Sequence, residues 1–257
     1  MDEKDLVRLF DLTGRVAVIT GGTRGIGRAM AEGFAAAGAK VVVASRKADA
    51  CAQAEQALVD QGAEALGVPT HMGDLDAVAN LVDRTVERFG ALDILVNNAA
   101  NALQMPLKDL TPDAWDKSYN PNLKGPVFLA KAAYPHLVQS PHAAILNVIS
   151  VGAITWSPGT SMYAGAKNAL LAFTRNMAAE WATQGIRVNA LAPGTVDTDM
   201  VRNTGPEAMA RMKEISWMKR IADAREMVGP ALFLVSDAAS YVTGQLLVAD
   251  GGYAVAR

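Results

Sequence analysis

Tyr163 and Lys167 lie four residues apart, and Ser150 stands thirteen positions before the tyrosine. In a helix, residues i and i+4 share a face, so the ammonium of Lys167 can lie beside the phenol of Tyr163. A free phenol has a pKa of about 10, and a nearby cation lowers such a pKa by ~1 to 3 pKa units. The spacing therefore indicates a tyrosine that acts as a general acid or base near neutral pH.

The Tyr-x-x-x-Lys pair alone does not establish this chemistry. Lysine is common, and the pair arises by chance in roughly one chain in four that has five tyrosines. The elements that would have to position the two side chains decide between chance and catalysis.

A glycine-rich segment, Thr20–Gly27, follows an apolar run and precedes a helical pattern. Glycines at a strand-to-helix turn let the backbone approach a pyrophosphate, whose charge the N-terminus of the helix binds. The alternative is a tight turn without a ligand. The position between a strand and a helix favours a dinucleotide site, although the Gly-x-x-x-Gly-x-Gly spacing differs from the Gly-x-Gly-x-x-Gly of longer dehydrogenases. The cofactor contacts expected from this turn are Gly21, Thr23, Arg24 and Ile26.

The end of the second predicted strand carries Ser45 and Arg46 where an NAD-binding chain is expected to have an Asp or Glu. Two guanidiniums, those of Arg24 and Arg46, could converge on a 2′-phosphate that an acidic residue would repel. The alternative is that both arginines are solvated surface residues. We predict a preference for NADP(H) over NAD(H).

Two further loops follow predicted strands at the carboxyl edge, where open α/β sheets bind their ligands. Small residues after the fourth strand would leave room for the adenosine, and backbone groups after the sixth could fix a carboxamide. Either loop alone would be read as an ordinary turn. The expected cofactor contacts are Asn98 and Ala99 in the first loop, and Pro193, Gly194, Val196 and Thr198 in the second.

Short apolar, β-branched runs alternate with longer helical patterns along the whole chain. This alternation predicts a single-domain α/β fold over residues 1–257, a doubly wound (Rossmann-type) sheet of seven parallel strands with helices on both faces. The predicted strands are Val16–Thr20, Lys40–Ala44, Glu64–Val68, Ile94–Val96, Ala144–Ile149, Arg187–Leu191 and Leu246–Ala249. The predicted helices are Ile26–Ala37, Ala48–Gln61, Leu75–Phe89, Asp113–Val138, Tyr163–Thr183 and Ala224–Val235.

The composition limits the classes of partner. The chain has 24 basic and 26 acidic residues and no dense Lys/Arg run, so we expect no nucleic acid to bind. A single cysteine, Cys51, and three scattered histidines give no metal motif. The sequence contains neither a signal-peptide pattern nor an uninterrupted apolar stretch of ~20 residues, so we expect a cytoplasmic protein without a membrane segment.

Taken together and in this order, the motifs resemble those of the short-chain dehydrogenases/reductases over almost the whole length. The resemblance rests on Thr20–Gly27, Asn97-Asn98-Ala99, Ser150, Tyr163-x-x-x-Lys167, Pro193-Gly194 and the ending Asp250-Gly251-Gly252. It implies a nicotinamide-dependent oxidoreductase that moves hydride to or from a carbonyl carbon. By the same resemblance, adenine contacts are expected from Asp74 and Leu75 after the third strand.

The resemblance also assigns catalytic roles. Tyr163 would exchange a proton with the substrate oxygen, and Ser150 would hold that oxygen. Lys167 would lower the pKa of Tyr163 and bind the nicotinamide ribose, and Tyr163 would also contact the cofactor. Asn122 matches the family's asparagine that steadies a water in the proton relay, although Pro121 before it is unusual and would remove a helical hydrogen bond. Ala100 stands where the family commonly has glycine, and Tyr163-Ala164-Gly165-Ala166-Lys167 stands where it commonly has Tyr-Ser-Ala-Ser-Lys.

Residues 199–221 fall where the family places a substrate lid, and this segment is rich in methionine. Together with other loops it could line an adaptable apolar pocket, but packing into the core is an alternative for such a pattern. The candidates are Met105, Trp156, Met200, Met209, Met212, Trp217 and Met218.

The substrate expected is a small-molecule ketone or secondary alcohol. Within the family, a 3-oxoacyl-carrier reductase and a sugar or polyol dehydrogenase are alternatives. Pro141 and Gln184 stand where carrier reductases often have basic docking residues, which argues against the first of these. An alternative of another class is a nucleotide-binding regulatory or scaffold protein without turnover.

The helix that carries Tyr163 and Lys167 has hardly any polar face, because apolar residues and alanines alternate along it. Such helices are buried on more than one side. A second copy of the chain could cover the outer side, so we predict a homotetramer or a homodimer.

Overall fold

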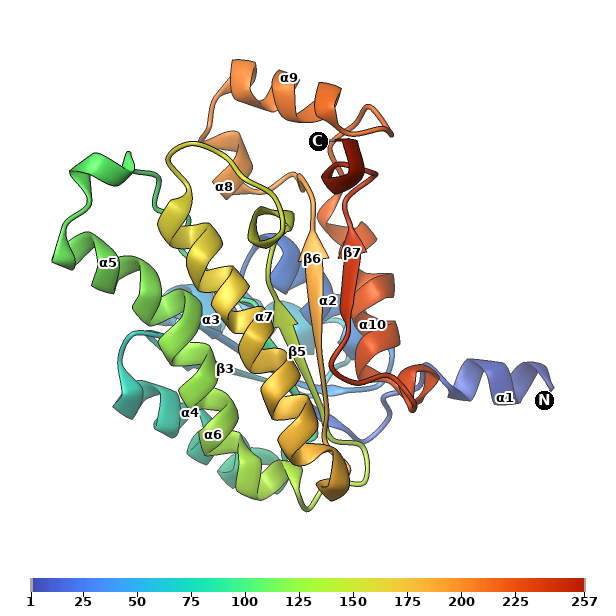
Figure 1. Ribbon diagram of the computed structural model, residues 1–257. Helices are drawn as coiled ribbons and strands as arrows, with labels where there is room; N and C mark the ends of the chain where they lie inside the picture. The colour runs from blue at the N-terminus through green and yellow to red at the C-terminus, as the bar shows by residue number, and fades with distance from the viewer. Residues whose placement is uncertain (1, 257) are drawn as a thin grey trace.

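The computed structural model describes residues 2–256, which form a seven-stranded parallel sheet with strand order β3-β2-β1-β4-β5-β6-β7 (Figure 1). The order reverses between β1 and β4, so the carboxyl ends of these two strands open a crevice where ligands of such sheets bind. The strands are β1 (Val16–Thr20), β2 (Lys40–Ser45), β3 (Ala65–Pro69), β4 (Ile94–Asn97), β5 (Ala144–Val148), β6 (Arg187–Pro193) and β7 (Leu246–Ala249). The predicted fold class is confirmed, and each predicted strand is present within two residues of its expected bounds.

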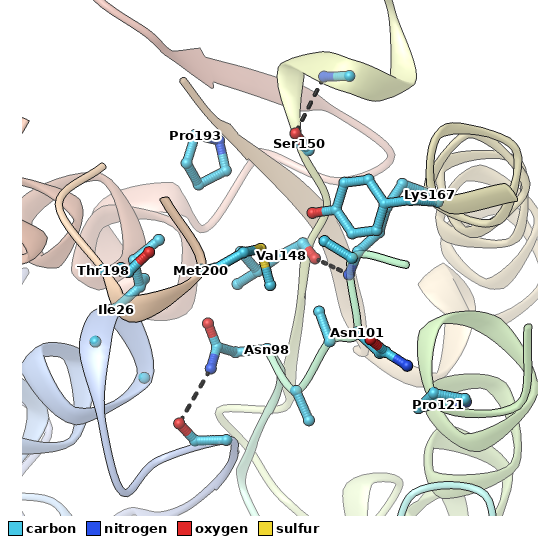
Figure 2. A pocket seen from close by; sticks show the side chains of 18 of the residues that line it. Ile26, Asn98, Asn101, Pro121, Val148, Ser150, Lys167, Pro193, Thr198 and Met200 are labelled. Carbon is cyan, nitrogen blue, oxygen red and sulfur yellow. Dashed lines mark hydrogen bonds between the residues drawn. The ribbon is translucent and has the colours of Figure 1, made fainter. Parts of the chain in front are cut away.

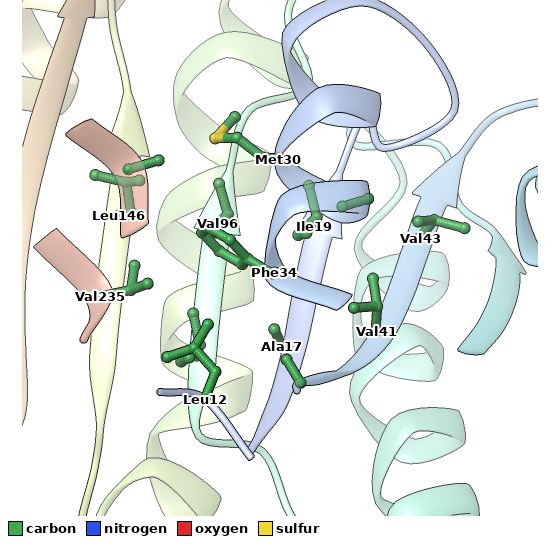
Figure 3. Close-up of a cluster of buried hydrophobic side chains, with 14 of the residues drawn as sticks. Leu12, Ala17, Ile19, Met30, Phe34, Val41, Val43, Val96, Leu146 and Val235 are labelled. Atoms are coloured by element: carbon green, nitrogen blue, oxygen red, sulfur yellow. The ribbon is translucent and has the colours of Figure 1, made fainter. Parts of the chain in front are cut away.

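Successive residues of β1 face opposite sides of the sheet, and each side packs against its own layer of helices. Ala17 and Ile19 belong to the cluster that includes Met30 and Phe34 of α2 (Gly25–Ala36) (Figure 3). Val16 and Val18 belong to the opposite cluster. The first layer also contains α3 (Ala48–Val59) and α10 (Val228–Val235), and the second contains α4 (Leu75–Phe89), α6 (Gly125–Leu137) and α7 (Ser161–Trp181). A sheet covered on both faces explains strands that are apolar throughout.

One long helix was predicted over Asp113–Val138, and the structure divides it. Helix α5 (Pro112–Tyr119) is followed by a π-helical turn (Asn120–Lys124) and then directly by α6. Pro121 lies inside the π-helical turn, where its missing N–H and its ring disfavour regular α-helical bonding. The predicted single helix is therefore interrupted by a widened turn at the proline.

Three helices were not predicted from the sequence. The first, α1 (Glu3–Arg8), projects from the body of the molecule and has no buried residue (Figure 1). The other two, α8 (Asp199–Arg202) and α9 (Pro206–Ile215), lie in the segment expected to form a lid, beyond the carboxyl ends of the strands. None of the three helices buries a residue completely, so none of them contributes to the core.

Within residues 2–256, no helix combines the length and apolar character that crossing a membrane requires. In the same part of the chain, no three His, Cys, Asp or Glu side chains come together as ligands for a metal ion.

Candidate active site

A cleft of about 1040 Å³ lies at the carboxyl edge of the sheet, and fifteen of the eighteen predicted site residues line it (Figure 2). These residues come from the carboxyl ends of β1, β2, β4, β5 and β6 and from α7, whereas other residues supply the wall at the end of β3. They are Gly21, Thr23, Arg24, Ile26, Ser45, Arg46, Asn98, Ala99, Ser150, Tyr163, Lys167, Pro193, Gly194, Val196 and Thr198. The structure thus brings together the cofactor motifs and the Tyr-Lys pair, which are far apart in the sequence.

The glycine-rich turn between β1 and α2 is packed so closely that side chains cannot replace its glycines. A Cβ on Gly27 would lie 2.3 Å from the carbonyl oxygen of Gly21, and one on Gly21 would lie 2.8 Å from Asn98 Nδ2. Gly21 and Gly25 also have φ of +68° and +53°, which glycine adopts at no steric cost. The backbone is therefore exposed to the cleft at the N-terminus of α2, which fits the pyrophosphate of a dinucleotide.

Asn98 fastens the loop after β4 to this turn. Its Nδ2 donates to the carbonyl of Thr20 at 2.9 Å, and its own N–H donates to Thr20 Oγ1 at 2.9 Å. The N–H of Ala99 shares the same hydroxyl at 3.0 Å. Neighbouring Ala100 needs no special backbone, since Lys219 is the only non-glycine residue with positive φ among residues 2–256.

The predicted catalytic side chains come from two elements. Ser150 follows β5 and begins a short 3-10 turn, and its Oγ accepts from the N–H of Gly152 at 3.1 Å. Tyr163 and Lys167 lie one turn apart on α7, and Lys167 Nζ donates to the carbonyl of Val148 at 2.8 Å (Figure 2). The same ammonium lies 5.9 Å from the centre of the Tyr163 ring. The hydroxyl, the phenol and the ammonium therefore share one wall of the cleft.

Burial controls the ionisation of both groups on α7. It lowers the pKa of Lys167 to about 8, so the ammonium persists at neutral pH but is costly to keep in the interior. Burial also raises the pKa of Tyr163, and a hydrogen bond with Ser150 opposes this effect. The pKa of Tyr163 is thus raised, whereas the sequence predicted that Lys167 would lower it. Desolvation of the phenolate outweighs the favourable contacts that the protein makes with it.

The side chain of Asn122 does not line the cleft, but it bonds to Asn101, in the loop after β4 that forms part of the cleft wall. Its Nδ2 donates to the carbonyl of Asn101 at 2.7 Å, and its Oδ1 accepts from the N–H of the same residue at 3.0 Å. The side chain of Asn101 in turn donates to the carbonyl of Lys117 at 3.3 Å. In a regular helix the N–H of residue 121 would bond to this carbonyl, which Pro121 cannot do. Asn101 therefore takes over a hydrogen bond that the proline removes.

The glycine at position 165, between Tyr163 and Lys167, is explained by a steric constraint. A Cβ at this position would lie 2.7 Å from Tyr119 Oη, on the facing helix α5. The Tyr119 ring itself stacks on Trp115 with ring centres 4.1 Å apart. The glycine thus lets α5 approach the helix that carries the catalytic pair.

Asp74 and Leu75 do not lie in the lining, in contrast to the expectation from the family resemblance. Asp74 is the N-cap of α4, and its Oδ1 accepts from the N–H groups of Asp76 and Ala77 at 3.0 and 3.2 Å. The residues that line the cleft after β3 are instead Thr70, His71, Met72 and Gly73. Their position directly after the end of a strand is the sequence signal that would have identified them.

Outside the predicted site residues, the lining of the cleft combines apolar and polar side chains. Of the seven apolar candidates, Met200 and Met212 lie in the lining, and the other five do not. Met218 instead lines a second cavity of about 410 Å³ beside Gly251 and Gly252. The sequence did not predict several neutral polar residues of the lining, which belong to no motif: Gln104, Thr155, Ser157, Thr160, Asn203 and Thr204.

A parallel sheet with an exposed glycine turn at one end of its cleft and a Ser-Tyr-Lys group at the other defines a dinucleotide-dependent oxidoreductase. Comparison with known families agrees, because the sequence model described as enoyl-(acyl carrier protein) reductase matches residues 21–254. The chain belongs to the short-chain dehydrogenase/reductase family, whose members use a nicotinamide cofactor, and it is an oxidoreductase enzyme.

Individual relatives cover nearly the whole chain. Human dehydrogenase/reductase SDR family member 4 is 37% identical over 98% of this chain and 92% of that protein. Cis-4-hydroxycyclohexanecarboxylate dehydrogenase of Sinomonas cyclohexanicum is 40% identical over 93% of this chain and 96% of that protein. A solved gluconate 5-dehydrogenase from Burkholderia cenocepacia, in complex with NADP and tartrate, superimposes with a TM-score of 0.93 at 34% identity, covering 97% of this chain and 99% of its own.

Proposed function

We propose that the protein is an NADP(H)-dependent oxidoreductase that interconverts a carbonyl compound and a secondary alcohol, with Tyr163 as general acid and base. The observation that carries this proposal is the shared wall of Ser150, Tyr163 and Lys167, which faces the same cleft as the glycine-rich turn. When bound, the nicotinamide supplies or accepts the hydride. All other roles belong to side chains of the cleft.

Ser150 and Tyr163 are the two hydroxyls available to a substrate oxygen. In reduction, Ser150 donates a hydrogen bond to that oxygen, and Tyr163 transfers its proton to it. The raised pKa of Tyr163 supports the acid role, because the phenol stays protonated at neutral pH. Lys167 supplies a positive charge near the phenolate that forms, which stabilises the product of the proton transfer.

The preference for NADP(H) is supported by the side chains at the adenosine end. Arg24 and Arg46 both line the cleft, and Ser45 at the end of β2 occupies the position where an acidic residue would oppose a 2′-phosphate. The Burkholderia gluconate 5-dehydrogenase, which is similar in structure, was solved with NADP.

A fluorescence titration of NADPH and NADH tests the cofactor, and a panel of ketones and alcohols with the preferred cofactor then tests the reaction. We expect tighter binding of NADPH and turnover of at least one carbonyl substrate. Tighter binding of NADH would contradict the role of the two arginines. Hydride transfer without any dependence on Ser150 would contradict the role of the hydroxyl.

Neutral polar side chains in the lining, among them Thr155, Ser157 and Thr160, favour small polar or mixed substrates, so the panel should include sugars and polyols. Relatives named as gluconate and galactose dehydrogenases support this choice. A relative named 3-oxoacyl-[acyl-carrier-protein] reductase keeps the carrier-linked reaction as an alternative. Pro141 and Gln184 provide no cation for an acidic carrier, so we expect a free ketone to be the better substrate.

Self-association and a substrate lid complete the proposal. Phe128 of α6 and Phe173 of α7 are exposed by 40% and 41%, and we propose that a second copy of the chain covers them in a homotetramer or homodimer. Light scattering after size-exclusion chromatography tests this, and a monomeric wild type would contradict it.

We propose that residues 199–221 form the lid over the substrate. Met200 of α8 and Met212 of α9 both line the cleft, which supports this proposal.

A further inference from the structure

Arg24 is already paired with a carboxylate. Its Nη1 lies 3.1 Å from Oδ2 of Asp199, the first residue of α8, and both residues line the cleft. Arg46 differs, because it forms no ion pair with any residue in the range 2–256. The two arginines expected to bind a 2′-phosphate are therefore not equally available.

The pair with Asp199 joins the glycine-rich turn to the first residue of α8. Thr198, which precedes α8, also lies close to this turn, because its Cγ2 would be 3.1 Å from a Cβ on Gly25. Figure 2 shows Thr198 beside Ile26, at the N-terminus of α2. The carboxylate of Asp199 therefore lies next to the turn that would receive the cofactor.

Asp199 also faces a second cation, but at a greater distance. Its Oδ1 lies 3.7 Å from Arg202 Nη1, while Arg202 Nε bonds to Asp197 Oδ1 at 2.7 Å. Arg202 is thus mainly the partner of Asp197, which leaves Asp199 as the partner of Arg24. The side chains of Arg24 and Asp199 are 74% and 53% exposed, so water weakens their attraction without abolishing it.

We propose that Asp199 is a specificity-determining residue that limits the preference for NADP(H) over NAD(H). Its carboxylate competes with a 2′-phosphate for the guanidinium of Arg24. NAD(H) carries a hydroxyl at this position and does not compete for the arginine. Binding of the 2′-phosphate to Arg24 therefore releases Asp199 from this ion pair.

This inference depends on the proposed function, and the dissociation constants of NADPH and NADH for Asp199→Asn test it. Asparagine keeps the shape and removes the charge, so we expect NADPH to bind ~3- to 10-fold more tightly, with NADH unchanged. The range corresponds to the modest coupling of exposed ion pairs. Asp197→Asn is the matched control, because it removes a carboxylate two residues away that is paired with Arg202, and we expect neither constant to change.

A double-mutant cycle identifies the arginine through which Asp199 acts. In an Arg24→Ala background, Asp199→Asn should no longer strengthen NADPH binding selectively, whereas in an Arg46→Ala background the effect should persist. An equal change for both cofactors, no change at all, or an effect that survives the loss of Arg24 would each overturn the inference. The proposed cofactor preference fails separately, if the wild type itself binds NADH more tightly than NADPH.

Discussion

The two ends of the cleft are held in different ways. At the cofactor end, glycines and buried amides fix the backbone: Gly27 leaves no room for a Cβ, and Asn98 bonds to Thr20 through both its side chain and its backbone. At the substrate end, α8 and α9 bury no residue completely, and their ion pairs are exposed. Close packing tolerates little change, whereas exposed contacts contribute little each. The two ends should therefore respond very differently to single substitutions.

The largest effect is expected at the glycine-rich turn. A Cβ on Gly27 would lie 2.3 Å from the carbonyl oxygen of Gly21, so Gly27→Ala must displace the backbone that meets the pyrophosphate. We expect cofactor affinity to fall by ~100-fold or more, since displacing packed backbone costs several kcal/mol. Gly229→Ala is the control, because no atom lies within 4 Å of its Cβ position and binding should not change. Isothermal titration measures both, and wild-type affinity in Gly27→Ala would contradict the packing argument.

The next effect concerns the buried charge of Lys167, whose pKa is lowered from 10.5 to about 8. Below pH 8 the folded and unfolded states both hold the proton, and the folded state carries the full cost of burying it. Between pH 8 and 10.5 the folded state releases the proton first, so the free energy of unfolding contributed by this group increases as pH rises. The difference in pKa corresponds to ~3 kcal/mol.

Lys167→Met removes this dependence. Relative to the variant, the wild type should gain up to ~3 kcal/mol in free energy of unfolding between pH 7.5 and 10.5, as measured by urea denaturation. Because both proteins share all other titrating groups, these cancel in the difference. A difference between wild type and variant that does not change with pH would show that burial does not perturb this lysine.

A smaller effect is expected where α5 meets α7. Gly165→Ala gains up to ~1 kcal/mol of helix propensity but forces a Cβ to within 2.7 Å of Tyr119 Oη, so we expect net destabilisation of ~1 kcal/mol. In a Tyr119→Phe background the obstructing oxygen is gone, and the same alanine should stabilise the protein. Thermal denaturation of the four proteins measures the cycle. The same sign of effect in both backgrounds would refute the steric explanation of Gly165.

The smallest effect belongs to the substrate end. Met212 lines the cleft and Met209 on the same helix does not, so the two form a matched pair. Met212→Gln should raise KM for apolar ketones by ~3- to 10-fold through the loss of apolar contact, while Met209→Gln leaves KM unchanged. Steady-state kinetics on one substrate series compares them. Equal effects of the two substitutions would place the binding determinants elsewhere.

The same contrast separates what the sequence could predict from what it could not. Strands and the glycine-rich turn follow local rules, so β1, β7 and α4 were predicted with their observed bounds, and Gly21 and Ile26 lie in the cleft as expected. The exposed helices α8 and α9 bury no residue completely, and they were not predicted from the sequence. Which methionines reach the cleft depends on how that segment folds back over the sheet.

Other features depend on contacts between distant residues. The π-helical turn at Pro121 could be expected as a kink, but the role of Asn101 in replacing the lost hydrogen bond requires the loop after β4 to lie alongside. The pKa of Tyr163 was predicted from its neighbour Lys167 alone, and burial, which the spacing does not reveal, reverses the direction. Asp74 was assigned by motif, whereas the end of β3 at Pro69 points to His71 and Met72.

In the proposed reaction, Tyr163 transfers the proton, while the other residues of the cleft supply most of the contacts that bind the cofactor and position the substrate. Tyr163→Phe removes only the phenolic oxygen, so NADPH affinity and NADPH oxidation should be measured on the same preparation. We predict NADPH affinity within about twofold of the wild type and a turnover number lower by ~100-fold or more. A variant that retains wild-type turnover would contradict the role of Tyr163 as the general acid and base.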